Sequence, residues 1–248
     1  MKKVYNNPPL VEVIFEIELE NNNWDPAVPG IIYSNLKDTF PNRKEGSHNT
    51  IRISSDNPTP EIVRTSIAKF STEDESTFVQ VGPDLLMINK IKNYTVWEEY
   101  FELIKKTIEV YFKELSPIKI NKISLKYLNQ INIGEENLKI EDYFNFRPNI
   151  EAKITEEISS FIVGIKIPYN ESEDILKLVL NNTKPNKPNE TSFILELEYY
   201  SNAIDKVENL TEWLGKANKI IKEKFEACIT DKSRSLFGEV NEYDDNHI

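Results

Sequence analysis

Strict alternation of apolar and polar residues is the feature of this sequence that most constrains its fold. The clearest case is the segment 119–133. One face of that segment carries Ile123, Leu125, Tyr127, Asn129, Ile131 and Ile133, and the other carries Lys122, Ser124, Lys126, Gln130 and Asn132. Residues 10–19 have the same period, with glutamates between apolar positions. A period of two is that of a strand with one buried face, which favours antiparallel over doubly buried parallel sheets.

Further segments alternate in the same way and are separated by turn-forming residues. The expected strands are 50–54, 61–70, 77–81, 85–91, 158–167, 175–180 and 191–200. Apolar residues spaced by three and four predict long amphipathic helices over 95–115 and 205–229. Shorter helices are expected over 25–40 and 140–144, and 42–60 is otherwise expected to be a polar loop.

These elements predict an α+β protein. Two antiparallel meanders are each followed by a long amphipathic helix, and the helices pack on one sheet face. Residues 1–238 form a single unit, for which two similar halves, 1–133 and 134–238, remain open, and 239–248 are expected to be an acidic flexible tail. A helix-grip arrangement, with one C-terminal helix held by a curved sheet, is the alternative.

The composition restricts the environment and the partners. The 41 acidic and 30 basic residues give a net charge of −11, which disfavours nonspecific binding to nucleic acid or anionic membranes. No apolar run approaches the ~20 residues that span a bilayer. The single cysteine, Cys228, cannot form an intramolecular disulfide, which fits a reducing compartment. We therefore expect a cytoplasmic protein without membrane contact.

Histidine, cysteine and glycine-loop chemistry find little support. The only histidines are His48, expected in a loop, and His247, next to the chain end, and no zinc-binding spacing occurs. Cys228 lies on the apolar stripe of the last long helix, as core residues do. Glycine-rich phosphate loops are also absent from the sequence. We expect no cofactor and no metal.

Carboxylates leave one catalytic alternative open. Glu196 and Glu198 share one face of a predicted strand and could form an acid/base or metal-binding pair, although lysines opposite them would make an ordinary solvated face. Other acidic groups, including Glu173 with Asp174, are expected in solvated turns. The lysines of 119–133 leave a second alternative, binding of RNA or single-stranded DNA along an open sheet.

Several segments resemble a sporadically distributed family of uncharacterised prokaryotic proteins of about this length. The resemblance is carried, in order, by NNPPLVEVIFEIEL, VGPDLLMINKIKNYTVWEEYFELIKKTIEVYF, ISLKYLNQINI and FEACITDKSRSLFG. It spans nearly the whole chain and implies one family unit, and the patchy distribution of the family suggests mobile or defence-type gene islands. Where relatives often have an arginine before the tyrosine, this chain has Lys126, which weakens a bidentate anion site there.

The polar residues of the resembling segments are the candidate binding residues: Glu12, Lys126, Asn129 and Asp231. Asn129 interrupts an apolar strand face, so its amide is either a structural hydrogen-bond centre or part of a pocket. The biochemical activity stays unknown at this stage. The sequence favours a noncatalytic interaction or ligand-binding protein, with a protein partner or a second copy, over a carboxylate-dependent hydrolase or nuclease and over nucleic-acid binding.

Overall fold

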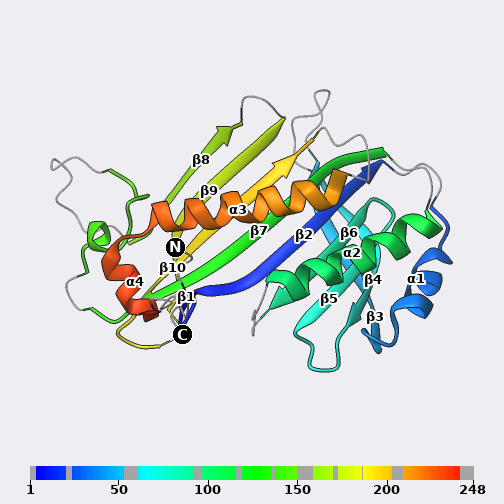
Figure 1. The fold of residues 1–248 in the computed structure, drawn as a ribbon, viewed down its shortest axis with the longest axis horizontal. Helices are drawn as coiled ribbons and strands as arrows, with labels where there is room; N and C mark the ends of the chain where they lie inside the picture. The colour runs from blue at the N-terminus through cyan, green and yellow to red at the C-terminus, as the bar shows by residue number, and fades with distance from the viewer. Residues whose placement is uncertain are drawn as a thin grey trace, which may run out of the picture.

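A computed structural model describes residues 4–20, 24–52, 61–91, 97–115, 119–135, 138–149, 159–169, 173–185, 187–202 and 209–240. Within these ranges one antiparallel sheet has nine strands in the order β3-β4-β5-β6-β2-β7-β10-β9-β8 (Figure 1). The strands are β2 Leu10–Glu20, β3 Asn42–Arg52, β4 Glu61–Ser71, β5 Thr77–Val81, β6 Leu85–Ile91, β7 Lys119–Ile133, β8 Ile162–Pro168, β9 Asp174–Thr183 and β10 Thr191–Ser201. The expected α+β class and antiparallel sheet are confirmed.

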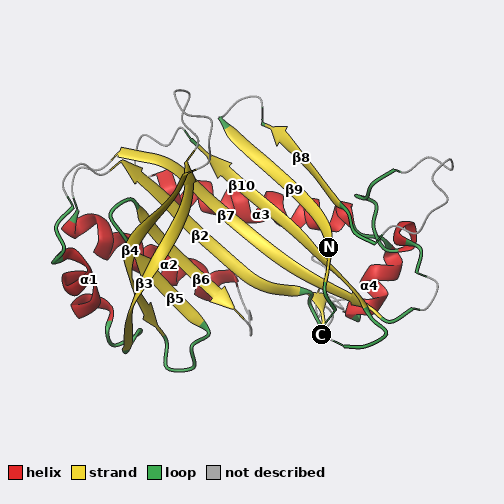
Figure 2. Ribbon diagram, turned by 180° about the vertical axis from the view of Figure 1, so that it is seen from behind, coloured by secondary structure: helices red, strands yellow, loops and turns green. Residues whose placement is uncertain are grey.

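Four α-helices accompany the large sheet in the described ranges. They are α1 Val28–Leu36, α2 Trp97–Glu114, α3 Leu210–Cys228 and α4 Asp231–Phe237, with a single 3-10 turn at Ile140–Asp142. In Figure 1, α2 and α3 lie in front of the sheet, and in the reversed view of Figure 2 they lie behind it. The short helix α1 packs against α2. The helix α4 lies at the end of the large sheet, beside a small second sheet of β1 Val4–Tyr5 and β11 Glu239–Val240.

The strands β2 and β7 lie side by side in the middle of the large sheet, with four of its described strands beyond β2 and three beyond β7. Their outer neighbours are β6 and β10, and the chain runs from β6 into α2 and from β10 into α3. The neighbour of β2 is thus followed in the chain by α2, and the neighbour of β7 is followed by α3. The order of elements on the two sides is similar, although β3 and α1 have no strand or α-helix as counterpart among the described residues of the second side.

The core lies between the sheet and the long helices. On β2 the side chains of Val13, Phe15 and Ile17 are fully buried, and they belong to the same apolar cluster as Tyr100 of α2 and Leu214 of α3. The Tyr100 hydroxyl fixes α2 to the sheet, because it donates to Ile88 O (2.6 Å) and accepts from Phe15 N (3.1 Å). These apolar positions are those that the alternation predicted.

A buried carboxylate fixes the second long helix, which corrects one expectation. Asp174 was expected in a solvated turn, but it begins β9 and is 4% exposed. It accepts hydrogen bonds from the Tyr199 hydroxyl (2.8 Å), Trp213 Nε1 (3.1 Å) and Lys216 Nζ (2.8 Å). The indole and ammonium groups both come from α3, so the buried carboxylate has hydrogen-bond partners that link β9 to this helix.

Other boundaries also differ from expectation. Residues 42–49 were expected in a polar loop, but β3 runs over Asn42–Arg52 and pairs with β4, so pairing with a neighbour overrides the polar composition. The last long helix ends at Cys228, and a separate helix, α4, follows. Glu239 and Val240, the first residues of the expected tail, form β11, while 241–248, the predicted cap at Thr95 and Ile158 lie outside the described residues.

Candidate functional site

One face of the large sheet carries charged side chains and is called the polar face below. Its charged members near the central strands are Glu12, Glu16, Glu18, Lys122, Lys126, Lys177, Glu196 and Glu198. Strand register brings them together: Glu198 lies opposite Lys126 on β7 and opposite Lys177 on β9. The alternate residues of these strands are buried in the core cluster with residues of α2 and α3, so the polar face is directed away from those two helices, which lie behind the sheet in Figure 2.

Most of these charges neutralise one another. Glu198 is 5% exposed, and its carboxylate lies 3.0 Å from Lys122 Nζ, 3.8 Å from Lys177 Nζ and 3.9 Å from Lys126 Nζ. The neighbouring Glu196 accepts from Lys177 Nζ at 2.8 Å. The lysines therefore compensate the two glutamates that had been considered as a catalytic pair. Lysines opposite them were part of the alternative, but the solvated face that it also expected is not found at Glu198, which is buried.

The pKa values of two carboxylates on the polar face, Glu16 and Glu198, are shifted in opposite directions. Burial acts to raise the pKa of Glu198, but the charges of Lys126 and Lys122 outweigh it, and the pKa lies below its ordinary value. Burial raises the pKa of Glu16 above its ordinary value, although Lys122 opposes the shift. Burial likewise works against the charged form of Lys122, but Glu198 holds the pKa of that ammonium group above its usual range.

The structure brings two of the four predicted site residues to one face and leaves two elsewhere. Glu12 and Lys126 are on the polar face, where Glu12 Oε1 accepts from Asn89 Nδ2 at 2.8 Å. Asn129 lies on the opposite, buried face and donates to Leu195 O at 3.2 Å, which is a structural role. Asp231 is exposed in the first turn of α4, with Oδ1 2.6 Å from Arg234 Nη1. The four residues therefore do not form one site.

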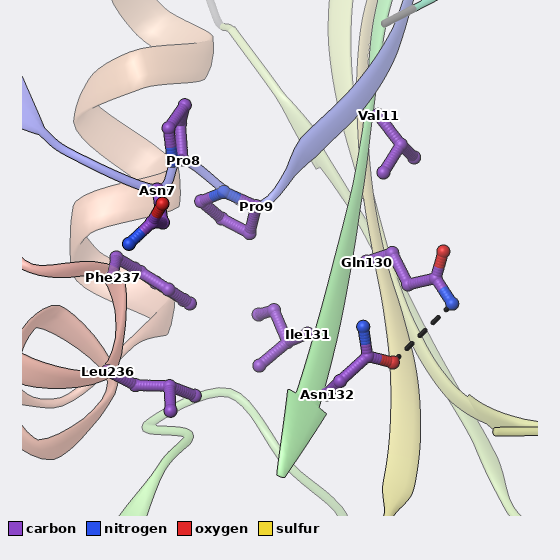
Figure 3. Close-up of a pocket in the computed structure, with 9 residues that line it drawn as sticks. All are labelled: Asn7, Pro8, Pro9, Val11, Gln130, Ile131, Asn132, Leu236 and Phe237. Carbon is purple, nitrogen blue, oxygen red and sulfur yellow. Dashed lines mark hydrogen bonds between the residues drawn. The ribbon is translucent and has the colours of Figure 1, made fainter. Parts of the chain in front are cut away.

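A separate pocket of about 330 Å³ lies where the N-terminal segment, β7 and α4 meet (Figure 3). Its lining residues are Asn7, Pro8, Pro9, Val11, Gln130, Ile131, Asn132, Leu236 and Phe237. That volume is at the lower end of the range for small-ligand pockets. None of these described lining side chains is titratable, so together they offer amide groups and apolar surface and no acid, base or nucleophile.

Local sequence explains the walls of the pocket. Pro8 and Pro9 delay the start of β2, while Pro9 O still accepts from Gln130 N at 2.8 Å. The pairing of β2 with β7 then shifts register between Leu10 and Glu12, which leaves Val11 as the extra residue of a bulge, 38% exposed. Such a bulge re-aims a side chain, and Figure 3 shows Val11 at the rim of the pocket.

The opposite wall depends on how α4 is held. Thr230 caps α4 by accepting from Ser233 N (3.4 Å), and Gly238 ends the helix in the left-handed conformation. Gly238 O accepts from Asn6 N (3.0 Å), so the C-terminal turn is fixed to the N-terminal segment. Leu236, which is 43% exposed, is thereby placed in the lining of the pocket, on the other side of β7 from Val11 in the view of Figure 3.

Two side-chain amides present a free donor and a free acceptor. Ser192 Oγ donates to Asn132 Oδ1 (2.7 Å) and accepts from Gln130 Nε2 (3.1 Å), and Gln130 Nε2 also lies 3.5 Å from Asn132 Oδ1. These bonds leave Asn132 Nδ2 and Gln130 Oε1 without a partner among the described residues. A backbone amide has one N–H donor and one C=O acceptor, so Gln130 Oε1 and Asn132 Nδ2 together are complementary to an amide-bearing ligand.

The sequence had placed Gln130 and Asn132 on the polar side of their strand, but nothing singled them out from its lysines. Leu236 had no sequence signal at all, because a single leucine in a short polar segment does not predict an exposed pocket wall. The proline pair belongs to NNPPLVEVIFEIEL, one of the segments that carry the family resemblance, but the sequence assigned it no part in a pocket.

Within the described ranges, no group of three or more histidine, cysteine or acidic residues could hold a metal ion, and no helix is long and apolar enough to cross a membrane. Cys228 is buried in the core, and burial raises the pKa of its thiol to about 11. No protein-family model and no curated protein matches the chain.

Proposed function

We propose that this protein is a noncatalytic binding protein, and that its pocket takes an uncharged, amide-bearing segment of a protein partner. The observation that carries the proposal is the chemistry of the lining: one amide donor and one amide acceptor without a partner among the described residues, beside apolar side chains, and no titratable group among the lining residues that the structure describes. A peptide backbone supplies the matching donor and acceptor, and an apolar side chain of the partner would cover the exposed Val11 or Leu236.

The charges of the polar face favour a protein partner over nucleic acid. Lys122 and Lys177 each form an ion pair of 3.0 Å or less with a glutamate, so their charges are already compensated. A nucleic-acid surface needs cations that are free to replace the counterions of phosphates. The proposal includes the predicted arrangement in which each meander is followed by one long helix and both helices pack on the same sheet face. With both helices on that face, neither of them covers the pocket or the polar face.

A titration with a small uncharged peptide mimic tests the proposal. N-acetyl-leucine N-methylamide has two amides and one apolar side chain. At about 0.3 kcal/mol per heavy atom, its expected dissociation constant is on the order of 1 mM. Two-dimensional NMR of the labelled full chain would then show saturable shifts of the side-chain amide signals of Gln130 and Asn132.

Two matched substitutions give the control. Leu236→Lys places a charge in the pocket wall and is expected to abolish saturation. Ile31→Lys changes a leucine-sized residue of nearly equal exposure, 41% against 43%, on the remote α1 and is expected to leave the titration unchanged. Equal loss in both variants, or saturable shifts that map away from the pocket, would contradict the proposal.

One observation favours a carboxylate-dependent hydrolase as a second candidate. The pKa of Glu16 is raised, mainly by burial, and that of Glu198 is lowered by its lysines, and a split of this kind is what an acid and a base require. Calorimetric titration with Mg²⁺ and Mn²⁺ and assays on nucleic acid and nucleotides test it. Turnover lost in Glu16→Gln and Glu198→Gln would establish this candidate and overturn the noncatalytic one.

Binding of RNA or single-stranded DNA through Lys122 and Lys126 stays a prediction of the sequence alone. Fluorescence anisotropy with labelled oligonucleotides at low salt tests it. Because the lysines are paired with Glu198, we expect no saturable binding of the oligonucleotides. Reversal of both lysine charges should then leave the measured anisotropy unchanged.

A further inference from the structure

The strand β8 forms one edge of the large sheet and is unusually apolar for an edge. Its sequence is IVGIKIP, with Lys166 as the only charged residue. Ile162 is 76% exposed and Ile165 is 42% exposed, so two of the five exposed large apolar residues in the described chain lie on this one strand. In Figure 1, β8 is the last strand on its side of the sheet.

The backbone of β8 offers hydrogen-bonding groups to a further strand. Tyr169 N donates to Asp174 O (3.0 Å), and Phe161 N donates to Asn182 Oδ1 (2.8 Å), so the odd-numbered residues direct their backbone groups toward β9. In an antiparallel sheet these directions alternate along a strand. The backbone groups of Ile162, Gly164 and Lys166 therefore point outward, and Pro168, which has no N–H, ends the row.

The opposite edge of the sheet is protected in the usual way. The strand β3 carries Arg43, Lys44 and Glu45 at its start, and all three are exposed. Charged side chains on an edge strand discourage pairing with another chain. Of the two edges of the large sheet, β8 is the one whose described residues combine outward backbone groups with apolar side chains on both faces.

We propose that β8 pairs with β8 of a second copy of this chain, in antiparallel register about Ile165, so that two sheets join into one. The register is self-complementary. Ile165 faces the partner's Ile165, Val163 faces the partner's Ile167, and Ile162 faces the partner's Pro168. Each Lys166 faces a glycine, Gly164, so no like charges lie directly opposite each other.

This register also satisfies the backbone. Gly164 and the partner's Lys166 both direct their N–H and C=O groups outward, so they form a hydrogen-bonded pair. Ile165 directs its own groups toward β9 and therefore forms a non-hydrogen-bonded pair with its copy, in which Cα atoms lie about 4.5 Å apart. The strands β9 and β10 separate β8 from β7, so the dimer leaves the pocket open and does not depend on the proposed function.

A cysteine cross-link tests the register. A Cα separation of about 4.5 Å is within the range that a disulfide bridges, so Ile165→Cys should form a covalent dimer on mild oxidation of the full chain. The matched control is Ile162→Cys. Position 162 is more exposed, and random collisions would cross-link it faster, but in this register it lies far from its copy and should stay monomeric on a nonreducing gel.

The oligomeric state tests the dimer itself. Light scattering of the wild-type chain at about 100 µM should give twice 28.9 kDa, and Ile165→Glu should weaken association about tenfold by placing two carboxylates opposite each other. Ile162→Glu should weaken association less. A monomeric wild type, or Ile162→Cys cross-linking as fast as Ile165→Cys, would overturn the proposal, whatever the outcome of the peptide-mimic titration.

Discussion

The strand β7 contributes residues to both the pocket and the polar face, and the two regions differ in whether their polar side chains already have partners within the protein. Lys122 and Lys126 of the polar face are occupied by Glu198, which is almost fully buried. Gln130 and Asn132, further along the same strand, keep one donor and one acceptor unused among the described residues. The charged part of the strand is thus satisfied within the protein, whereas the uncharged part has capacity left for a ligand.

The difference shows that charge is a poor guide to the site in this protein. Ion pairs that are already formed have to be broken before their members can bind anything, and a buried member makes that costly. Free amide groups beside exposed apolar side chains can be covered by a ligand without such a loss. We therefore expect substitutions on the polar face to change stability, and substitutions in the pocket to change binding.

The largest expected effect comes from neutralising the buried carboxylate of the polar face. Glu198→Gln should lower the free energy of unfolding at pH 7 by about 2 kcal/mol, because hydrogen bonds and ion pairs to a charged group are lost. The pKa of Glu198 is lowered in the folded state, so its contribution is present above the unfolded-state pKa and is lost as the pH falls through the folded-state pKa. Denaturant titrations at pH 7 and at acid pH measure this.

Glu16→Gln is the matched control and should have the opposite sign. The pKa of Glu16 is raised, chiefly by burial, so the folded state favours its protonated form and the ionised form costs stability at neutral pH. The substitution should raise stability at pH 7, and the gain should disappear below the unfolded-state pKa. The same sign for both variants at pH 7 would show that the polar face is not organised as described. Neither variant should weaken binding of the peptide mimic.

A smaller effect is expected at the turn that supports the pocket. Gly238 has φ +68°, and a Cβ there would lie 3.3 Å from Asn6 Cβ. Gly238→Ala should lower stability by about 1 kcal/mol or slightly more and should weaken peptide binding, because the turn fixes α4 to the N-terminal segment.

Gly215→Ala is the control for that change. Gly215 lies within α3 with no atom within 4 Å of an added Cβ, so alanine should raise stability by about 0.5–1 kcal/mol through helix propensity. Thermal denaturation of both variants measures the contrast. A loss of stability in Gly215→Ala that equals the loss in Gly238→Ala would contradict the role of the left-handed turn.

The sequence predicted the fold better than the site, for physical reasons that individual residues show. Alternation along β7 and β2 is set by burial of one face, so it appears directly in the sequence and identifies Val13, Phe15 and Leu125 as core residues. The length of β3 was missed because pairing with β4, rather than its own polar residues, makes it a strand.

The candidate site was predicted only in part. Glu12 and Lys126 share the polar face as their register requires, and Asn129 lies on the buried side, where the alternation had placed it. The pocket depends on contacts between residues more than a hundred positions apart, such as Asn6 with Gly238 and Pro9 with Gln130. No local pattern encodes those contacts, and the bulge at Val11 becomes visible only when β2 and β7 are paired.

The pH dependence of peptide-mimic binding tests the central claim most directly. The claim is that the pocket binds through neutral amides and apolar walls and uses no acid or base. The dissociation constant of N-acetyl-leucine N-methylamide, measured by NMR between about pH 5.5 and 8.5, should then be constant within error, since no lining side chain titrates in that range. A sigmoidal or bell-shaped dependence, with shifts centred on Glu16 or Glu198, would contradict the claim.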